Sequence, residues 1–181
     1  MKKVLILLVV LMCSAGCEAL FGPDNSDFGR RHPIPDGMDV NIPLPVEWSV
    51  KDGEIEASYT EAGVYENVTD TYLQVWEGFQ GGIYQYDFYY GPLPAGEIFL
   101  RCYEVTENIP LSESRLTQAS TVEISATTTF SCLVNKQEFV IYEGVWGEYY
   151  AARIEVWFKN AETLQERKLL EKVYRVEGWQ R

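Results

Sequence analysis

The feature that most restricts the fold of this chain is a two-residue alternation of side chains, which recurs from residue 71 onward. In residues 97–106, one set of alternate positions holds Ile98, Leu100 and Cys102, and the other holds Phe99, Arg101, Tyr103 and Val105. Successive side chains of a strand point to opposite faces, so the alternation predicts half-buried β-strands. Further strand-like runs occupy 71–77, 83–90, 121–132, 138–143, 151–159 and 168–177, and residues 46–60 are expected to supply one or two more.

Turn-forming residues separate these runs, at Gly81-Gly82, Gly91-Pro92, Asn135-Lys136 and the glycines of 144–147. Seven to nine short strands at this spacing predict an all-β chain folded as an antiparallel β-sandwich, immunoglobulin-like or similar. The one helical pattern is Leu111–Gln118, which Ser112 is placed to cap and Glu113 suits in the first turn. It predicts a short helix in a crossover between strands.

Residues 93–100, with the sequence LPAGEIFL, place Pro-Ala-Gly directly before a strand. This segment resembles the start of a strand in many immunoglobulin-like and prealbumin-like bacterial modules. The resemblance covers eight residues, supports the fold class and implies no function.

Five of the eight prolines fall before residue 46, together with several glycines and aspartates. Such a composition does not favour regular structure and is typical of a spacer. The sequence therefore predicts a tether over residues 17–45 and a folded domain over 46–181.

The N-terminus has the layout of a secretory signal, because Lys2 and Lys3 precede the apolar run 4–12. This run is shorter than the roughly 20 apolar residues that span a bilayer. Small residues then lead to Cys17, in the sequence SAGC. Residues 1–17 thereby resemble the lipobox of bacterial lipoprotein precursors, although Ser14 stands where that family usually has leucine.

The resemblance implies removal of residues 1–16 and acylation of the thiol and the new amino group of Cys17, which would anchor the chain to a membrane. Cys13 would leave with the signal, since bulky Met12 fits poorly next to a cleavage site. The alternative is an ordinary signal peptide cleaved nearby. Either reading places the protein outside the cytoplasm, in the cell envelope.

The formal net charge is −12, and loss of Lys2 and Lys3 with the signal would make it −14. Such a chain is repelled by nucleic acid and by anionic lipid headgroups, so DNA or RNA binding is not expected.

Two cysteines, Cys102 and Cys132, remain in the expected domain. Export to an oxidising compartment favours a disulfide between neighbouring strands, and two buried free thiols are the alternative. The sequence has no CxxC motif or Cys/His cluster, so neither a redox site nor a zinc site is expected.

Motifs for catalysis, nucleotides or cofactors are also missing from the sequence. The single histidine, His32, falls in the expected tether, where it is poorly placed for a catalytic triad. Acidic pairs such as Glu143 with Glu148, or Asp87 with Glu97, are expected to be solvated charges rather than a glycosidase pair. We expect no catalytic residues, no metal ligands and no cofactor.

Aromatic residues are abundant, with 12 Tyr, 8 Phe and 5 Trp. In the run 83–90 one face carries Tyr84, Tyr86, Phe88 and Tyr90. These rings form either part of the core or an exposed platform for sugar rings. The loop 143–150 places Trp146 and Tyr149 at or near its tip, where they are either contact residues or folded back over the sandwich.

Arg101, Arg153 and Arg175 are expected to pair with Glu97, Glu155 or Glu177 on the solvated face of the strands. Together these features predict a non-enzymatic, lipid-anchored binding or scaffolding domain that meets another envelope protein. The alternative is a carbohydrate-binding module that uses exposed aromatic rings.

Overall fold

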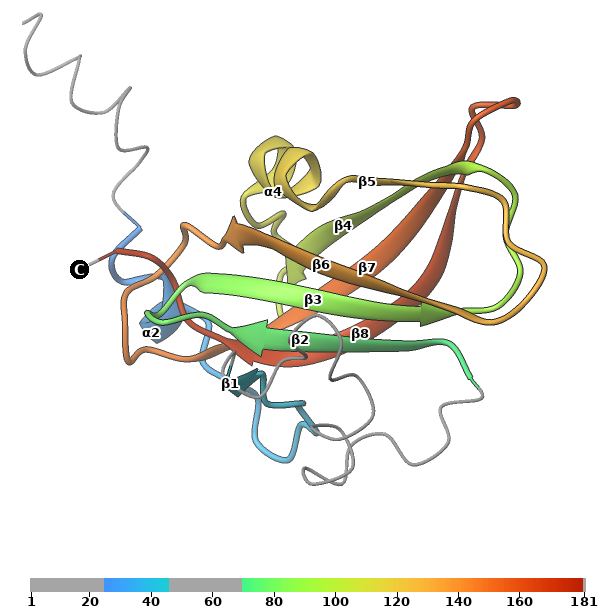
Figure 1. The fold of residues 1–181 in the computed structure, drawn as a ribbon. Helices are drawn as coiled ribbons and strands as arrows, with labels where there is room; N and C mark the ends of the chain where they lie inside the picture. Colours follow the sequence, from blue (N-terminus) through green and yellow to red (C-terminus); the bar gives the residue numbers. More distant parts are fainter. Residues whose placement is uncertain (1–24, 46–69, 181) are drawn as a thin grey trace, which may run out of the picture.

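Two four-stranded sheets lie face to face in the computed structural model, which describes residues 25–45 and 70–180 (Figure 1). The first sheet has the order β1-β2-β3-β6 and contains β1 (Leu44–Pro45), β2 (Tyr72–Glu77), β3 (Ile83–Tyr90) and β6 (Ser131–Val140). The second has the order β5-β4-β7-β8 and contains β5 (Val122–Ile124), β4 (Gly96–Glu104), β7 (Tyr150–Asn160) and β8 (Glu166–Val176). All strand pairs are antiparallel except β1 with β2. The predicted β-sandwich is confirmed.

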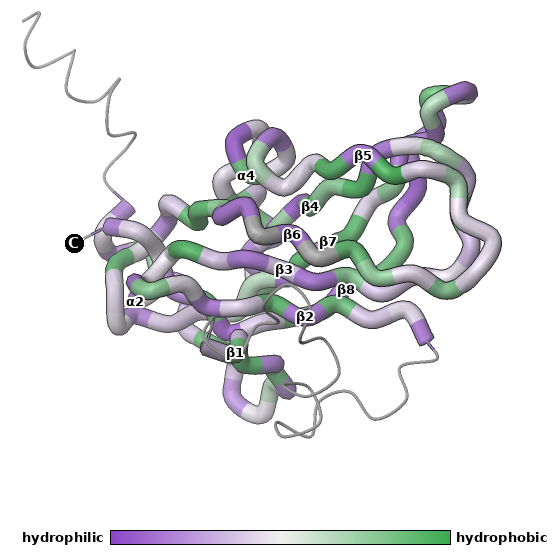
Figure 2. The backbone as a smooth tube through the Cα atoms, in the orientation of Figure 1, coloured by the Kyte–Doolittle hydropathy of each residue, from purple (hydrophilic) through white to green (hydrophobic). Residues whose placement is uncertain are grey.

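The core lies between the sheets and is built from the alternate positions that the sequence indicates. Figure 2 shows hydrophobic residues along the strands of both sheets. Ile98, Leu100 and Cys102 of β4 are buried there, opposite Leu73 and Val75 of β2.

The aromatic stripe of β3 belongs to this core, because Tyr84, Tyr86, Phe88 and Tyr90 are at most 5% exposed. The buried hydroxyls have partners: Tyr86 donates to the Ser120 carbonyl at 2.7 Å and Tyr84 to the Glu177 carbonyl at 3.2 Å. Burial raises the pKa of both tyrosines. The hypothesis of an exposed ligand platform on this strand is therefore wrong.

Strand β6 differs from the prediction, because it runs straight through Asn135-Lys136, where the sequence indicates a turn. Between the pairs Tyr84–Phe139 and Tyr86–Asn135, β6 has two more residues than β3. A bulge accommodates extra residues without ending a strand. Only Val122–Ile124 of the long predicted run 121–132 forms a separate strand, β5.

Helix α4 (Glu113–Ser120) joins β4 to β5 as the predicted crossover helix, two residues later than expected. Ser112 precedes it, but its side chain does not cap the helix; its hydroxyl donates to Glu143 at 2.9 Å. Leu116 is buried, and the Ser120 hydroxyl accepts a hydrogen bond from the Leu100 amide at 2.9 Å. The helix is thereby fixed against β4.

Residues 25–45 pack on the sandwich, so the prediction of a spacer is wrong for this part of the chain. Helix α2 (Phe28–Arg31) inserts Phe28 into the core, where it is 4% exposed. Asn41 pairs in parallel with Tyr174 of β8, and β1 pairs with β2, so the segment contacts an edge of both sheets. A proline-rich composition disfavours a regular strand but does not prevent short edge pairings. Residues 1–24, with the expected signal and Cys17, and the expected strands of 46–60 lie outside the described residues.

The predicted disulfide is also wrong, since Cys102 and Cys132 are both free. Cys102 lies on β4 in one sheet and pairs with Ile154, whereas Cys132 lies on β6 in the other sheet and pairs with Tyr89. The two strands are not neighbours. The alternative of two buried free thiols holds for Cys102 alone, since Cys132 is exposed. Burial raises the pKa of Cys102 above its usual range.

Candidate functional site

The solvent side of the sheet β5-β4-β7-β8 carries a group of aromatic and charged side chains, which we call the outer face. They occupy the alternate positions that point away from the core, and the strand pairing places them in rows. Its members are Phe99, Arg101 and Tyr103 of β4, Arg153, Glu155, Trp157 and Lys159 of β7, and Glu166, Lys168 and Glu171 of β8, with Glu97 at the start of β4.

Arginine side chains lie over the aromatic rings of this face. The guanidinium carbon of Arg101 is 4.3 Å from the ring centroid of Trp157 and 5.3 Å from that of Phe99. The guanidinium carbon of Arg153 is 5.1 Å from the ring centroid of Tyr103. Contacts of this kind fix the arginines in defined orientations.

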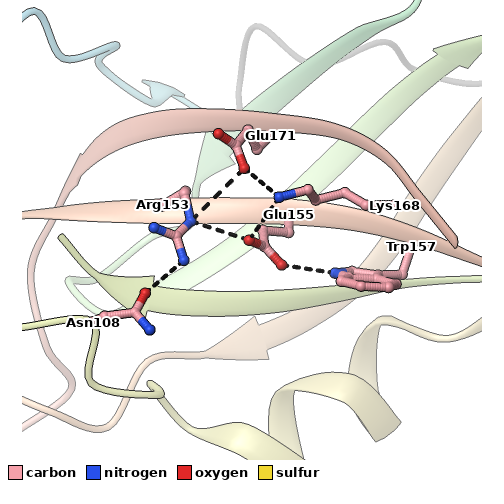
Figure 3. Close-up of polar contacts among 6 residues, drawn as sticks. All are labelled: Asn108, Arg153, Glu155, Trp157, Lys168 and Glu171. Atoms are coloured by element: carbon pink, nitrogen blue, oxygen red, sulfur yellow. Dashed lines mark hydrogen bonds and ion pairs between the residues drawn. The ribbon is translucent and has the colours of Figure 1, made fainter.

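Figure 3 shows the polar contacts around Arg153, which link it to Glu155 of β7, Glu171 of β8 and Asn108. Arg153 Nε lies 3.1 Å from Glu155 Oε1, and its terminal nitrogen donates to Asn108 at 2.6 Å. Lys168 bridges Glu155 and Glu171, with N–O distances of 3.2 Å and 2.5 Å. Arg101 pairs with Glu166 at 2.7 Å and Lys159 with Glu97 at 3.5 Å. Each basic residue of the outer face is thus balanced by an acidic one.

Glu155 is the centre of this network and is almost fully buried. Burial alone would raise the pKa of its carboxyl group, but hydrogen bonds from Trp157 and Lys168 outweigh that effect and the net pKa is lowered. Trp157 Nε1 donates to Glu155 Oε2 at 2.8 Å. The carboxylate therefore stays charged and holds Trp157, Arg153 and Lys168 in place.

The more exposed ion pairs of this face, Arg101 with Glu166 and Lys159 with Glu97, add little stability. Exposed ion pairs contribute about 0.2–1 kcal/mol each, because solvent screens them and long side chains lose entropy when they are held. The more informative property is local charge, since the outer face is close to neutral on a chain of net charge −12. An acidic partner therefore meets less repulsion there than elsewhere on the surface.

Some of the ion pairs of this site were predicted from the sequence. The pair of Arg153 with Glu155 is confirmed, but Arg101 pairs with Glu166 rather than Glu97, and Arg175 stacks on Tyr149. Tyr103 and Trp157 were not predicted as site residues. The alternation of side chains could have identified them, because it places them on the side of β4 and β7 opposite the core residues.

The loop 143–150 is held against the end of the sandwich. Trp146 is half-buried, and its amide donates to the Gln180 carbonyl at 3.2 Å. The Gly147 amide donates to the Glu177 carboxylate. Tyr149 remains 40% exposed, with the guanidinium carbon of Arg175 4.3 Å from its ring centroid. Of the two predicted loop residues, Tyr149 is therefore the more accessible.

Two carboxyl groups meet near this loop, those of Glu77 at the end of β2 and Glu177 after β8. Burial raises the pKa of Glu77, and the charge of Glu177 and a hydrogen bond to it raise it further, while Arg175 opposes the shift. A folded-state pKa above the unfolded value means that ionised Glu77 destabilises the fold at neutral pH. This penalty disappears as the pH falls through the raised pKa.

Glu77→Gln is therefore expected to stabilise the domain at pH 7, by less than about 1 kcal/mol because Glu77 is half-exposed and partly screened. The gain should vanish below about pH 3, where Glu77 is protonated in both states. Thermal unfolding at pH 7 and at the acidic pH measures this gain in stability. The exposed Glu123→Gln is the matched control, and an equal shift in the control would contradict the assigned repulsion.

His32 is buried rather than solvated, which corrects its predicted place in a tether. Its Nδ1 lies 3.7 Å from Glu104 Oε2 and 3.5 Å from Thr106 Oγ1. A catalytic relay needs the orienting carboxylate and the nucleophile on different ring nitrogens. Both groups face the same nitrogen here, so the arrangement serves to fix α2 against β4.

Within residues 25–45 and 70–180, no cluster of His, Cys, Asp and Glu side chains could hold a metal ion. The same residues include no helix long and apolar enough to cross a membrane. Comparison with protein-family models, with curated proteins and with solved structures gives no match.

Proposed function

We propose that this chain is a lipid-anchored protein of the cell envelope that binds another envelope protein through the outer face, without enzymatic activity. The observation that carries this proposal is the clustering of Arg101, Arg153, Tyr103 and Trp157 on one sheet face. Arginine, tyrosine and tryptophan dominate the residues that supply binding energy at protein interfaces. The anchor is supported by the signal-like N-terminus and its Ala-Gly-Cys17 sequence.

The arginine and aromatic side chains of the outer face are already fixed, which favours binding. A partner that contacts Arg101 or Trp157 would not need to order them, which reduces the entropic cost of association. The ion pairs with Glu155 and Glu166 hold Arg153 and Arg101, respectively, along the face.

A carbohydrate ligand is less well supported. The rings of β3 are buried in the core, and two more accessible rings, Trp157 and Tyr149, already have a guanidinium 4.3 Å from the ring centroid. A sugar ring would have to use the opposite ring face or displace the arginine.

Photocrosslinking in intact cells tests the proposal. A photoreactive aromatic residue in place of Tyr103 should capture a defined envelope protein, whereas the same residue in place of Tyr89, half-exposed on the other sheet, should not. Arg101→Ala should then weaken the purified complex by about 30-fold, as expected for the loss of a 2 kcal/mol contact.

The fold should tolerate Arg101→Ala, since its ion pair is exposed. Glu138→Ala, exposed on β6 of the other sheet, is the control for binding. Equal capture from both positions, or an affinity that does not change in the Arg101 variant, would rule out the outer face as the binding surface.

A further inference from the structure

Three exposed aromatic rings gather at one end of the sandwich, which we call the aromatic end. They are Phe79 in the β2–β3 turn, Tyr149 before β7 and Trp179 after β8, with 79%, 40% and 37% of their surface exposed. Large aromatic side chains are rarely left in water together without a role.

Hydrogen bonds hold these loops together as one surface. The Ile141 amide donates to the Gly82 carbonyl at 2.9 Å, and the Trp179 amide donates to the Ile141 carbonyl at 2.9 Å. The Gln180 amide donates to the Gly144 carbonyl at 3.1 Å. The β2–β3 turn, the β6–β7 loop and the C-terminal segment are therefore a single unit at this end (Figure 1).

The described chain also begins at this end. The Gly144 amide donates to the Asn25 carbonyl at 3.1 Å, and Arg30 of α2 pairs with Glu148 at 3.1 Å. Only seven residues lie between Cys17 and Asn25, which makes eight steps from Cα to Cα. Fully extended, such a segment reaches at most about 28 Å.

This reach is shorter than the sandwich. Strand β7 alone has 11 residues, which corresponds to about 36 Å at the usual rise, and it runs away from the aromatic end. An acylated Cys17 in a bilayer would thus hold the aromatic end closer to the membrane than the opposite β7–β8 hairpin. The connection excludes orientations in which the hairpin contacts the lipid and the aromatic end points away from it.

The chemistry of the surface suits that position. Tyrosine and tryptophan favour the interface between hydrocarbon and headgroups, where the ring is partly buried and the polar group stays hydrated. Among the neighbouring charges, Arg30 pairs with Glu148 and Arg31 with Asp27, while Glu77 and Glu177 leave negative charge at this end. Contact would depend on the rings rather than on attraction to anionic lipid.

We propose that the aromatic end rests on the bilayer that holds the acyl chains of Cys17, with Phe79 and Trp179 in the interface. This inference rests on the proposed function, since it requires the anchor. It places β7 and β8 upright on the membrane, so that the outer face is accessible to a partner from the side.

Quenching of tryptophan emission by bromine-labelled lipid tests the contact. The full chain, extracted with its native N-terminus, is incorporated into phosphatidylcholine vesicles with or without bromine in the upper acyl chains. Bromine should quench part of the emission of the wild type. Trp179→Phe should lose most of that quenched component, and Trp157→Phe, on the outer face, should retain it.

Phe79→Ser provides a second variant that should fold normally, because the side chain is largely exposed. It should lower the quenching of Trp179 by removing the most exposed ring. Protein that floats with the vesicles but is not quenched would overturn the proposal. The aromatic end would then bind a protein or a glycan instead of lipid. An unacylated chain that does not float would overturn the anchor as well.

Discussion

Phe28→Ala is expected to lower the free energy of unfolding by about 3–5 kcal/mol, the usual cost of removing a buried phenylalanine. Phe28 packs against Tyr150 and His32, with ring-centroid distances of 5.1 Å and 4.4 Å. The same substitution in a solvated tether would hardly change the free energy of unfolding. Urea unfolding followed by tryptophan fluorescence measures the difference.

Ile42→Ala is the control, because Ile42 lies in the same segment but is 55% exposed. Its unfolding midpoint should stay close to that of the wild type. If Phe28→Ala also unfolded at the wild-type midpoint, residues 25–45 would not be part of the folded domain.

Gly178→Ala is expected to disrupt the aromatic end and to destabilise the domain by more than the 1–3 kcal/mol that is typical of overpacking. A Cβ atom at position 178 would overlap the carbonyl oxygens of Glu143 and Gly144. These are backbone atoms and cannot rotate away as a side chain can. The β6–β7 loop would therefore have to separate from the C-terminal segment, with a lower unfolding midpoint and changed Trp146 and Trp179 emission.

Gly91→Ala is the matched control, since a Cβ atom there would have no heavy atom within 4 Å. It should be neutral or stabilise by up to about 1 kcal/mol through the unfolded state. Equal behaviour of the two alanine variants would show that Gly178 is not packed as described.

The strands whose pattern is local could be predicted from the sequence. Strands β2, β3, β4, β7 and β8 begin and end within about two residues of the predicted runs, because alternation of side chains depends only on the chain itself. The continuation of β6 through Asn135-Lys136 could not be predicted, since the bulge exists only by pairing with β3. The packing of Phe28 could not be predicted either, because one apolar residue among prolines and glycines carries little signal.

The candidate site, too, could be predicted only where the pattern is local. The alternation already placed Arg101 and Tyr103 opposite the core side of β4. The order β4-β7-β8 and its register bring Arg101 next to Trp157. They also place Glu155 between Arg153 and Lys168. Strand order is set by long-range packing, which the local pattern does not encode.

The claim on which the proposed function depends most is that Cys17 holds the domain on a membrane. Mass spectrometry of the N-terminal peptide, from protein isolated with the membrane fraction, tests it most directly. We expect a mature chain that begins at Cys17 and carries acyl chains on its thiol and amino groups. A chain that begins elsewhere, or an unmodified Cys17 in protein that washes off membranes, would contradict it.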